Sequence, residues 1–144
     1  MSSDSRGRMI GYWVATALAG LAFIAGGLID AARTPDVRAI MSHLGYPAYF
    51  AVILGIWKLL GGLAIVVPGV PRLKEWAYAG MVFDLTGALI SHITVGDPPS
   101  AWLTPVGLLV VVLGSWALRP QSRRLGNLAG GPRKAGATAQ ALAA

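Results

Sequence analysis

Long apolar runs alternate with short polar breaks along the 144 residues of the chain. Four runs, at 9–29, 48–67, 74–95 and 101–118, each hold about 20 mostly apolar residues, the length that carries an α-helix across a bilayer. The breaks at 68–71 and 96–99 are rich in proline and glycine and leave room only for a tight turn between antiparallel neighbours. This pattern predicts an all-α integral membrane protein whose four helices form a bundle.

The segment 30–47 departs from this pattern, because charged residues and a histidine interrupt it. Pro35 suits the first turn of a helix, and apolar residues then recur at helical spacing at Val37, Ile40, Met41 and Leu44. We therefore predict a short amphipathic helix that lies in the membrane interface between the first and second spans.

The run at 9–29 has a second interpretation, because basic residues precede it as they precede the apolar core of a signal peptide. That core is usually only about 7–15 residues long, whereas this run is long enough to span a membrane. A spanning helix is the preferred interpretation, and a cleaved signal peptide is the alternative.

Composition agrees with a membrane protein. Hydrophobic residues make up 55% of the chain and charged residues 12%, compared with about 25% charged residues in soluble domains. The net charge of +6 does not indicate nucleic-acid binding, since the basic residues flank the apolar runs as topology signals. The chain has no cysteine, which excludes disulfides, iron–sulfur clusters and thiolate metal sites.

The distribution of Lys and Arg predicts the orientation. Nine of them lie in residues 1–8, in the 68–74 turn and after residue 118, whereas the opposite side has only Arg33 and Arg38. The positive-inside rule then places both termini in the cytoplasm of a multi-pass protein of the bacterial inner membrane.

The expected organisation has three parts: a cytoplasmic N-terminus at 1–8, a transmembrane domain at 9–118 and a basic cytoplasmic tail at 119–144. We expect the tail to be disordered, because it lacks the aromatic and branched residues that build a core. Binding of the tail to anionic lipid headgroups is the alternative to a merely solvated tail.

Each predicted span holds two glycines seven residues apart, which places them on one helix face. Small residues on a face let helices approach closely in lipid, so we expect these glycines to line the interior of the bundle. The pairs are Gly20 and Gly27, Gly55 and Gly62, Gly80 and Gly87, and Gly107 and Gly114.

Two opposite charges lie near the middle of neighbouring spans, where a charge costs roughly 2.5–3.5 kcal/mol. Lys58 and Asp84 share the glycine faces and have similar depth, so we expect them to meet. One interpretation is a buried ion pair that fixes the register of the two helices. A second is a polar centre that binds a ligand or relays protons, with Trp57 beside it. A third is that the two charges do not pair and each reaches toward the interface. No residue is assigned a catalytic role.

Three further residues are secondary site candidates. His92 lies two turns outward from Asp84, with Ser91 closer to the same face, and His43 lies on the amphipathic segment. Both histidines are expected to be interfacial. One alternative is that His92 lines an outer mouth of the cavity or caps an inward network. Another is a haem or metal pair of the two histidines, which requires that the segment 30–47 fold over the bundle.

Several of these residues also carry a resemblance to the DoxX and DoxX-like family of small bacterial membrane proteins. The resemblance covers roughly 9–118 and rests on Gly45-Tyr46-Pro47, Lys58 through Gly61, Leu73 through Gly80, and Asp84 through Gly87 on to Ser91-His92. It implies a four-helix inner-membrane protein and a link to quinone-dependent redox systems.

The resemblance and the charged pair together lead to an expected function. We expect an accessory subunit of a membrane redox system, with a partner redox subunit and a quinone near Lys58 and Asp84. The alternatives are a small membrane enzyme that acts on a lipophilic substrate, with Asp84 or His92 as acid or base, and a proton-coupled transporter that works as a homo-oligomer.

Overall fold

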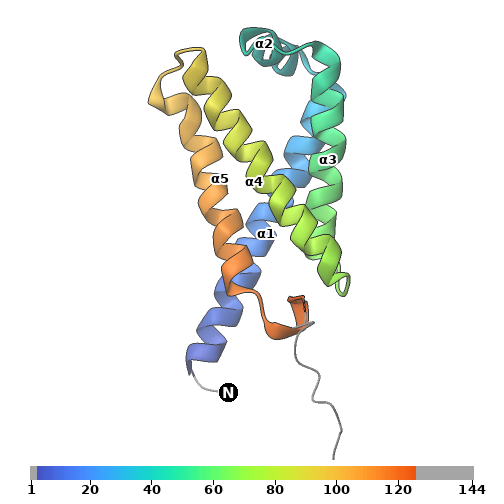
Figure 1. The fold of residues 1–144 in the computed structure, drawn as a ribbon, viewed down its shortest axis with the longest axis vertical. Helices are drawn as coiled ribbons and strands as arrows, with labels where there is room; N and C mark the ends of the chain where they lie inside the picture. The colour runs from blue at the N-terminus through green and yellow to red at the C-terminus, as the bar shows by residue number, and fades with distance from the viewer. Residues whose placement is uncertain (1–2, 126–144) are drawn as a thin grey trace, which may run out of the picture.

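The structure is a computed structural model and describes residues 3–125. The regular secondary structure of this part is all helical, and it holds no strand. In chain order its elements are α1 (Ser3–Ala32), α2 (Pro35–His43), α3 (Ala48–Val66), α4 (Pro71–Thr94), α5 (Pro99–Leu118) and the short 3-10 helix η1 (Gln121–Arg123) (Figure 1).

The helix boundaries follow local sequence signals. The Thr34 side chain accepts a hydrogen bond from the Val37 amide at 3.3 Å and caps the start of α2, with Pro35 in its first turn. Gly45 and Gly96, with φ of 81° and 79°, follow the ends of α2 and α4, where a left-handed residue lets the chain turn.

The four long helices pack in a closed series: α1 contacts α3 and α5, and α4 contacts the same two helices. We call the end with the start of α1, the α3–α4 turn and the end of α5 the lower end, and the end with α2 the upper end (Figure 1). From their turn at the lower end, α3 and α4 diverge toward the upper end, where α2 packs on α3.

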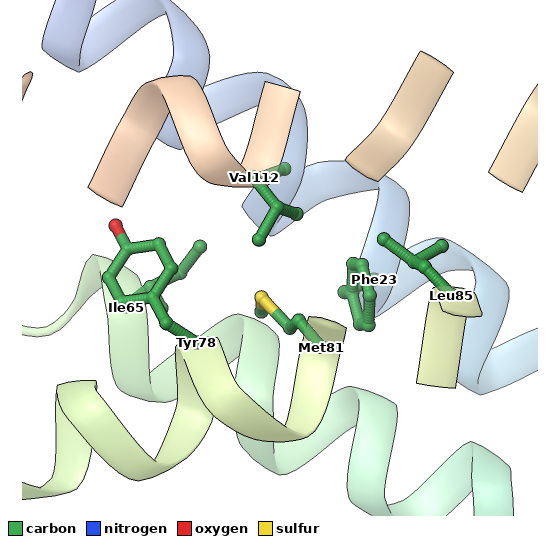
Figure 2. Packing of buried hydrophobic residues seen from close by; sticks show 7 residues of the cluster. Phe23, Ile65, Tyr78, Met81, Leu85 and Val112 are labelled. Atoms are coloured by element: carbon green, nitrogen blue, oxygen red, sulfur yellow. The ribbon is translucent and has the colours of Figure 1, made fainter. Parts of the chain in front are cut away.

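The main core lies among the long helices and is small (Figure 2). Its buried members are Ala19, Phe23, Ile65, Tyr78, Met81, Leu85 and Val112. A second cluster, Val37, Met41 and Ala51, joins α2 to α3. Many large apolar side chains instead face outward, including Phe83 at 75% exposure. An apolar exterior is what a lipid environment requires.

Among the described helices, three are long and apolar enough to cross a membrane: α1, α3 and α5. The helix α4, over which we also predict a span, is the least apolar of the four long helices, since Asp84 and His92 interrupt it. The coarse expectation of an all-helical protein with long apolar helices is therefore confirmed.

The predicted glycine faces are right for one helix pair and wrong for the other. A Cβ on Gly55 would lie 2.6 Å from the Gly27 carbonyl oxygen, and one on Gly62 would lie 3.1 Å from the Gly20 oxygen. These four glycines bring α1 and α3 into backbone contact. A Cβ on any of Gly80, Gly87, Gly107 and Gly114 would meet nothing within 4 Å, so those glycines do not line a helix contact.

Two predicted boundaries also differ. Helix α1 extends beyond both ends of the run at 9–29, so that Asp30 lies inside it. Residues 119–125, assigned above to the tail, pack on the helices, since Arg123 donates to the carbonyl oxygens of Ile65 at 3.4 Å and Val66 at 3.3 Å. The remainder of the predicted disordered tail lies outside the described residues.

Candidate functional site

Lys58 on α3 lies between two carboxylates from two other helices. Its ammonium donates to Asp30 Oδ2 of α1 at 2.8 Å and lies 3.7 Å from Asp84 Oδ2 of α4. The three side chains are largely buried, with exposed fractions of 24%, 17% and 16% for Lys58, Asp30 and Asp84. We call these three residues the polar centre.

The polar centre carries more negative than positive charge. One ammonium faces two carboxyl groups, so both carboxylates can be ionised only if one negative charge is left uncompensated. Such a charge is costly away from water. The centre is therefore suited to hold a proton, or to donate a remaining Lys58 N–H to a polar group of a ligand.

Asp30 is the member that sequence reasoning missed. The apolar run ends at Ile29, which led us to place Asp30 in the interfacial segment. A usable signal was present, because Asp30 follows Gly27 by three residues and shares its face. Gly27 contacts α3 at Gly55, three residues before Lys58.

Trp57 does not belong to the polar centre. Its side chain is 68% exposed on the outer face of α3, because successive residues on a helix point about 100° apart. The expectation that Trp57 lies beside the charged pair is contradicted by this orientation.

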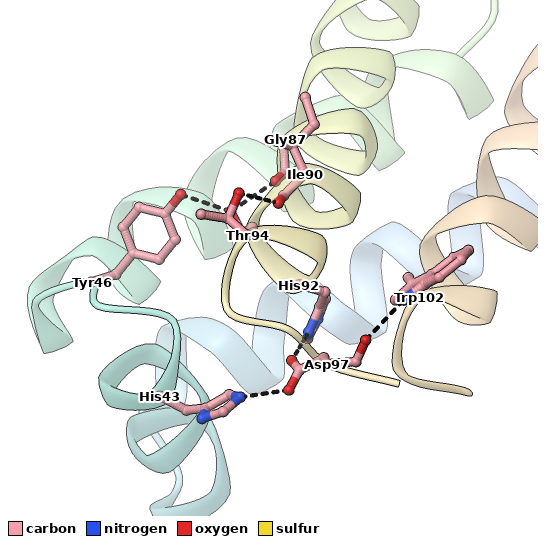
Figure 3. Close-up of polar contacts among 9 residues, drawn as sticks. His43, Tyr46, Gly87, Ile90, His92, Thr94, Asp97 and Trp102 are labelled. Atoms are coloured by element: carbon pink, nitrogen blue, oxygen red, sulfur yellow. Dashed lines mark hydrogen bonds and ion pairs between the residues drawn. The ribbon is translucent and has the colours of Figure 1, made fainter. Parts of the chain in front are cut away.

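The two histidines meet at the upper end, on either side of Asp97 (Figure 3). His43 Nε2 lies 2.7 Å from Asp97 Oδ1, and His92 Nδ1 lies 2.6 Å from Asp97 Oδ2. Trp102 Nε1 donates to the Asp97 backbone oxygen at 3.2 Å. Two hydrogen bonds hold the pKa of Asp97 below its ordinary value, and the one from His92 has the larger effect, followed by the one from His43.

This arrangement joins the two histidines through a shared carboxylate, and the haem or metal pair stays a prediction. From the segment 30–47, His43 contacts Asp97 in the loop between α4 and α5, and this carboxylate stands between the two imidazoles. No group of three or more ligating side chains suited to a metal ion occurs in residues 3–125. The hydrogen bonds of Asp97 with both histidines link α2 to the α4–α5 turn.

Ser91 makes a second link at the upper end. Its hydroxyl donates to the Gly87 carbonyl oxygen at 2.8 Å and accepts a hydrogen bond from the Tyr46 hydroxyl, also at 2.8 Å. Ser91, His92 and His43 thus belong to contacts that close the upper end, and the polar centre does not include them.

The lower end holds buried polar groups that the sequence analysis did not single out. The Ser115 hydroxyl lies 2.7 Å from both the Thr16 and the Tyr78 hydroxyl, and the three side chains are buried. Single hydroxyls at helical positions give no pattern of their own, because only the helix rotation decides whether they meet.

Lys74 is the most buried charge of this end, with no exposed surface. Its ammonium donates to the carbonyl oxygens of Ala64 at 2.8 Å and Ile65 at 3.0 Å, and also to that of Val67. The last turn of a helix leaves such carbonyls without helical partners. Lys74 therefore caps the end of α3.

Comparison with known proteins identifies the family to which the chain belongs. A profile of the DoxX-like family matches residues 14–115, which include all members of the polar centre. No curated protein and no solved structure is significantly similar to the chain. Membership together with the apolar helices indicates a membrane protein. The match covers most of the chain, which therefore belongs to the DoxX-like family.

Proposed function

We propose that this protein is an accessory subunit of a quinone-linked redox system in the bacterial inner membrane. The observation that carries the proposal is the polar centre, in which Lys58 is shared between Asp30 and Asp84 inside an apolar helical protein. Ionisable residues at such positions are expensive and typically functional.

The polar centre fits the head of a quinone. The Lys58 ammonium has three N–H donors and faces two carboxylates, so one donor is available to a carbonyl oxygen. Its side chain is also partly exposed. A bound quinone would supply two-electron redox chemistry, while Lys58 would orient its head and Asp30 and Asp84 would hold or release protons nearby.

A proton-coupled transporter, working as a homo-oligomer, is the second candidate, and the surplus carboxylate of the polar centre favours it. A carboxyl group that neutralises by taking up a proton can couple proton movement to a conformational change. The third candidate, an enzyme on a lipophilic substrate, has less support, since His92 contacts Asp97 and does not join Asp84.

The proposal includes a membrane arrangement. The four long helices span the bilayer as a bundle, α2 lies in the outer interface, and the lower end faces the cytoplasm. The Lys and Arg distribution supports this orientation. The series of helix contacts and the outward apolar side chains support a bundle within the membrane. A partner redox subunit would bind the apolar exterior.

The test is quinone content. The protein is purified in mild detergent from bacterial membranes, and quinone is extracted and measured per mole of protein. We expect Lys58→Met to lower the content at least threefold, with Asp36→Asn, a change at an exposed acid of α2, as the control. If the wild type and Lys58→Met both carry no more quinone than a membrane protein that does not bind quinone, the proposal is refuted.

A parallel measurement addresses the second candidate. Reconstituted vesicles report proton flux with a pH-sensitive dye, and a transporter requires that Asp84→Asn abolish the flux while Asp36→Asn preserves it. Flux without bound quinone would favour the transporter over the redox subunit.

A further inference from the structure

A cavity of about 330 Å³ opens between α4 and α5 toward the lower end. Its walls are mainly apolar and include Val82, Phe83 and Leu113, while Glu75, Tyr78 and Trp116 bring polar groups. This volume lies at the lower limit of ligand pockets, which hold about 300–1,000 Å³. A largely apolar cavity with a few polar groups fits an apolar chain that ends in a polar group.

A buried guanidinium lies beside three residues of the cavity lining. Arg119 Nη2 donates to Glu75 Oε1 at 2.8 Å, and its guanidinium carbon lies 4.9 Å from the Tyr78 ring centroid and 5.6 Å from that of Trp116. The Arg119 side chain is only 4% exposed, yet its Nη1 has no hydrogen-bond partner within residues 3–125. Buried donors are normally satisfied, so this atom needs an acceptor that the described part of the chain does not supply.

Two more arginines converge on the same end of α5. Arg8 Nη2 donates to the Ala117 carbonyl oxygen at 3.4 Å, and Arg124 Nη2 donates to the same oxygen at 3.1 Å. Arg124 Nε also donates to the Arg119 carbonyl oxygen at 2.8 Å. Three guanidinium groups therefore surround this end, where Glu75 supplies the carboxylate.

We propose that this end of the molecule binds an anionic phospholipid, with an acyl chain in the α4–α5 cavity and the phosphate at Arg8, Arg119 and Arg124. Phosphate oxygens are the acceptors that guanidinium groups bind best, and basic clusters at a membrane surface select anionic lipids. A free phosphate would explain the arginines but not the apolar cavity. The site does not depend on the polar centre or on the proposed redox role.

The test is native mass spectrometry of the full chain, released from detergent that contains equal phosphatidylglycerol and phosphatidylcholine. We expect at least a threefold preference for phosphatidylglycerol adducts. The double change Arg8→Gln/Arg124→Gln should reduce this preference toward one. Arg33→Gln/Arg38→Gln, which removes two charges from exposed positions at the upper end, should preserve it.

The cavity is tested separately by Ala79→Phe, which fills it from an exposed lining position of α4. This change should remove most adducts of both lipids, whereas Ala25→Phe at an exposed position of α1 should leave them. Circular dichroism and a thermal melt verify that each variant is folded. Unchanged adducts in folded Ala79→Phe, or equal adducts of the two lipids in the wild type, would overturn the proposal.

Discussion

At the scale of single residues, the polar centre is a shared interaction. Lys58 is closer to Asp30, at 2.8 Å, than to Asp84, at 3.7 Å. In a simple ion pair, removing one charge leaves the other without a partner. Here, removing either aspartate leaves Lys58 paired with the other one. Lys58 itself has no substitute, because its loss leaves two partly buried carboxylates close together.

This asymmetry predicts the order of stability among substitutions. Lys58→Met should lower the free energy of unfolding by about 3–5 kcal/mol, the usual cost of breaking a buried ion pair from one side. Asp84→Ala should cost clearly less, since Asp30 still pairs with Lys58. Denaturant titrations in detergent measure both, and an equal or larger loss for Asp84→Ala would contradict the shared arrangement.

Asp97 makes a second residue-scale prediction, on acid stability. The hydrogen bonds from His92 and His43 lower the pKa of Asp97 in the folded protein, whereas an unfolded aspartate has a pKa of about 3.9. The ionised carboxylate therefore stabilises the fold above that value, and this contribution is lost as the pH falls through the lower folded pKa.

Asp97→Asn should accordingly lose less stability than the wild type when the pH is lowered from 5 to 3. Thermal melts across that range measure the difference, and Asp36→Asn on the exposed face of α2 is the control. If Asp97→Asn and the wild type lose the same stability, the histidine contacts do not act on this carboxylate.

At the scale of elements, α1 and α3 form the closest helix pair of the described chain. Their glycines allow backbone atoms to touch, since a Cβ on Gly55 would lie 2.6 Å from both the Ala31 nitrogen and the Gly27 oxygen. The end of α3 is also held by Lys74. Close packing and a complete cap therefore fix α3 against its neighbours.

Glycine substitutions test this packing directly. Gly55→Ala should destabilise the protein by at least about 1–3 kcal/mol, because backbone on the opposite helix cannot make room. Gly87→Ala meets nothing within 4 Å and should stabilise α4 by about 0.5–1 kcal/mol. Unfolding in detergent measures both. Similar effects of the two changes would contradict the close α1–α3 contact.

At the scale of the whole molecule, the two ends have different chemistry. The upper end is closed by hydrogen bonds from α2 and its following loop to α4 and Asp97. At the lower end, Lys74, Arg123 and Arg124 lie around the ends of α3 and α5. A protein with one basic end is suited to a single orientation in a membrane.

The absence of cysteine makes this orientation testable. Ser42→Cys places a thiol at an exposed position of the upper end, and Ser122→Cys places one at the lower end. In intact cells without an outer-membrane barrier, a membrane-impermeant maleimide should label Ser42→Cys but label Ser122→Cys only after permeabilisation. The reverse labelling pattern would place the termini outside the cytoplasm.

Much of the local structure was predictable from the sequence. Runs of apolar residues and the proline–glycine breaks determine where helices begin and end, as for α3 and α5. The depth of Lys58 and Asp84 on antiparallel neighbours also followed from counting residues, and the structure places them 3.7 Å apart. These features depend on helix geometry, which is the same in every chain.

The sequence by itself thus determined a helical membrane protein with opposite charges at one depth. Only the tertiary structure decided that Asp30 is the closer partner of Lys58, that Trp57 faces outward, and that the histidines share Asp97. The physical reason is that rotation and crossing of helices depend on packing over the whole molecule. Residue spacing along one helix shows which side chains share a face, but it does not show which other helix packs against that face.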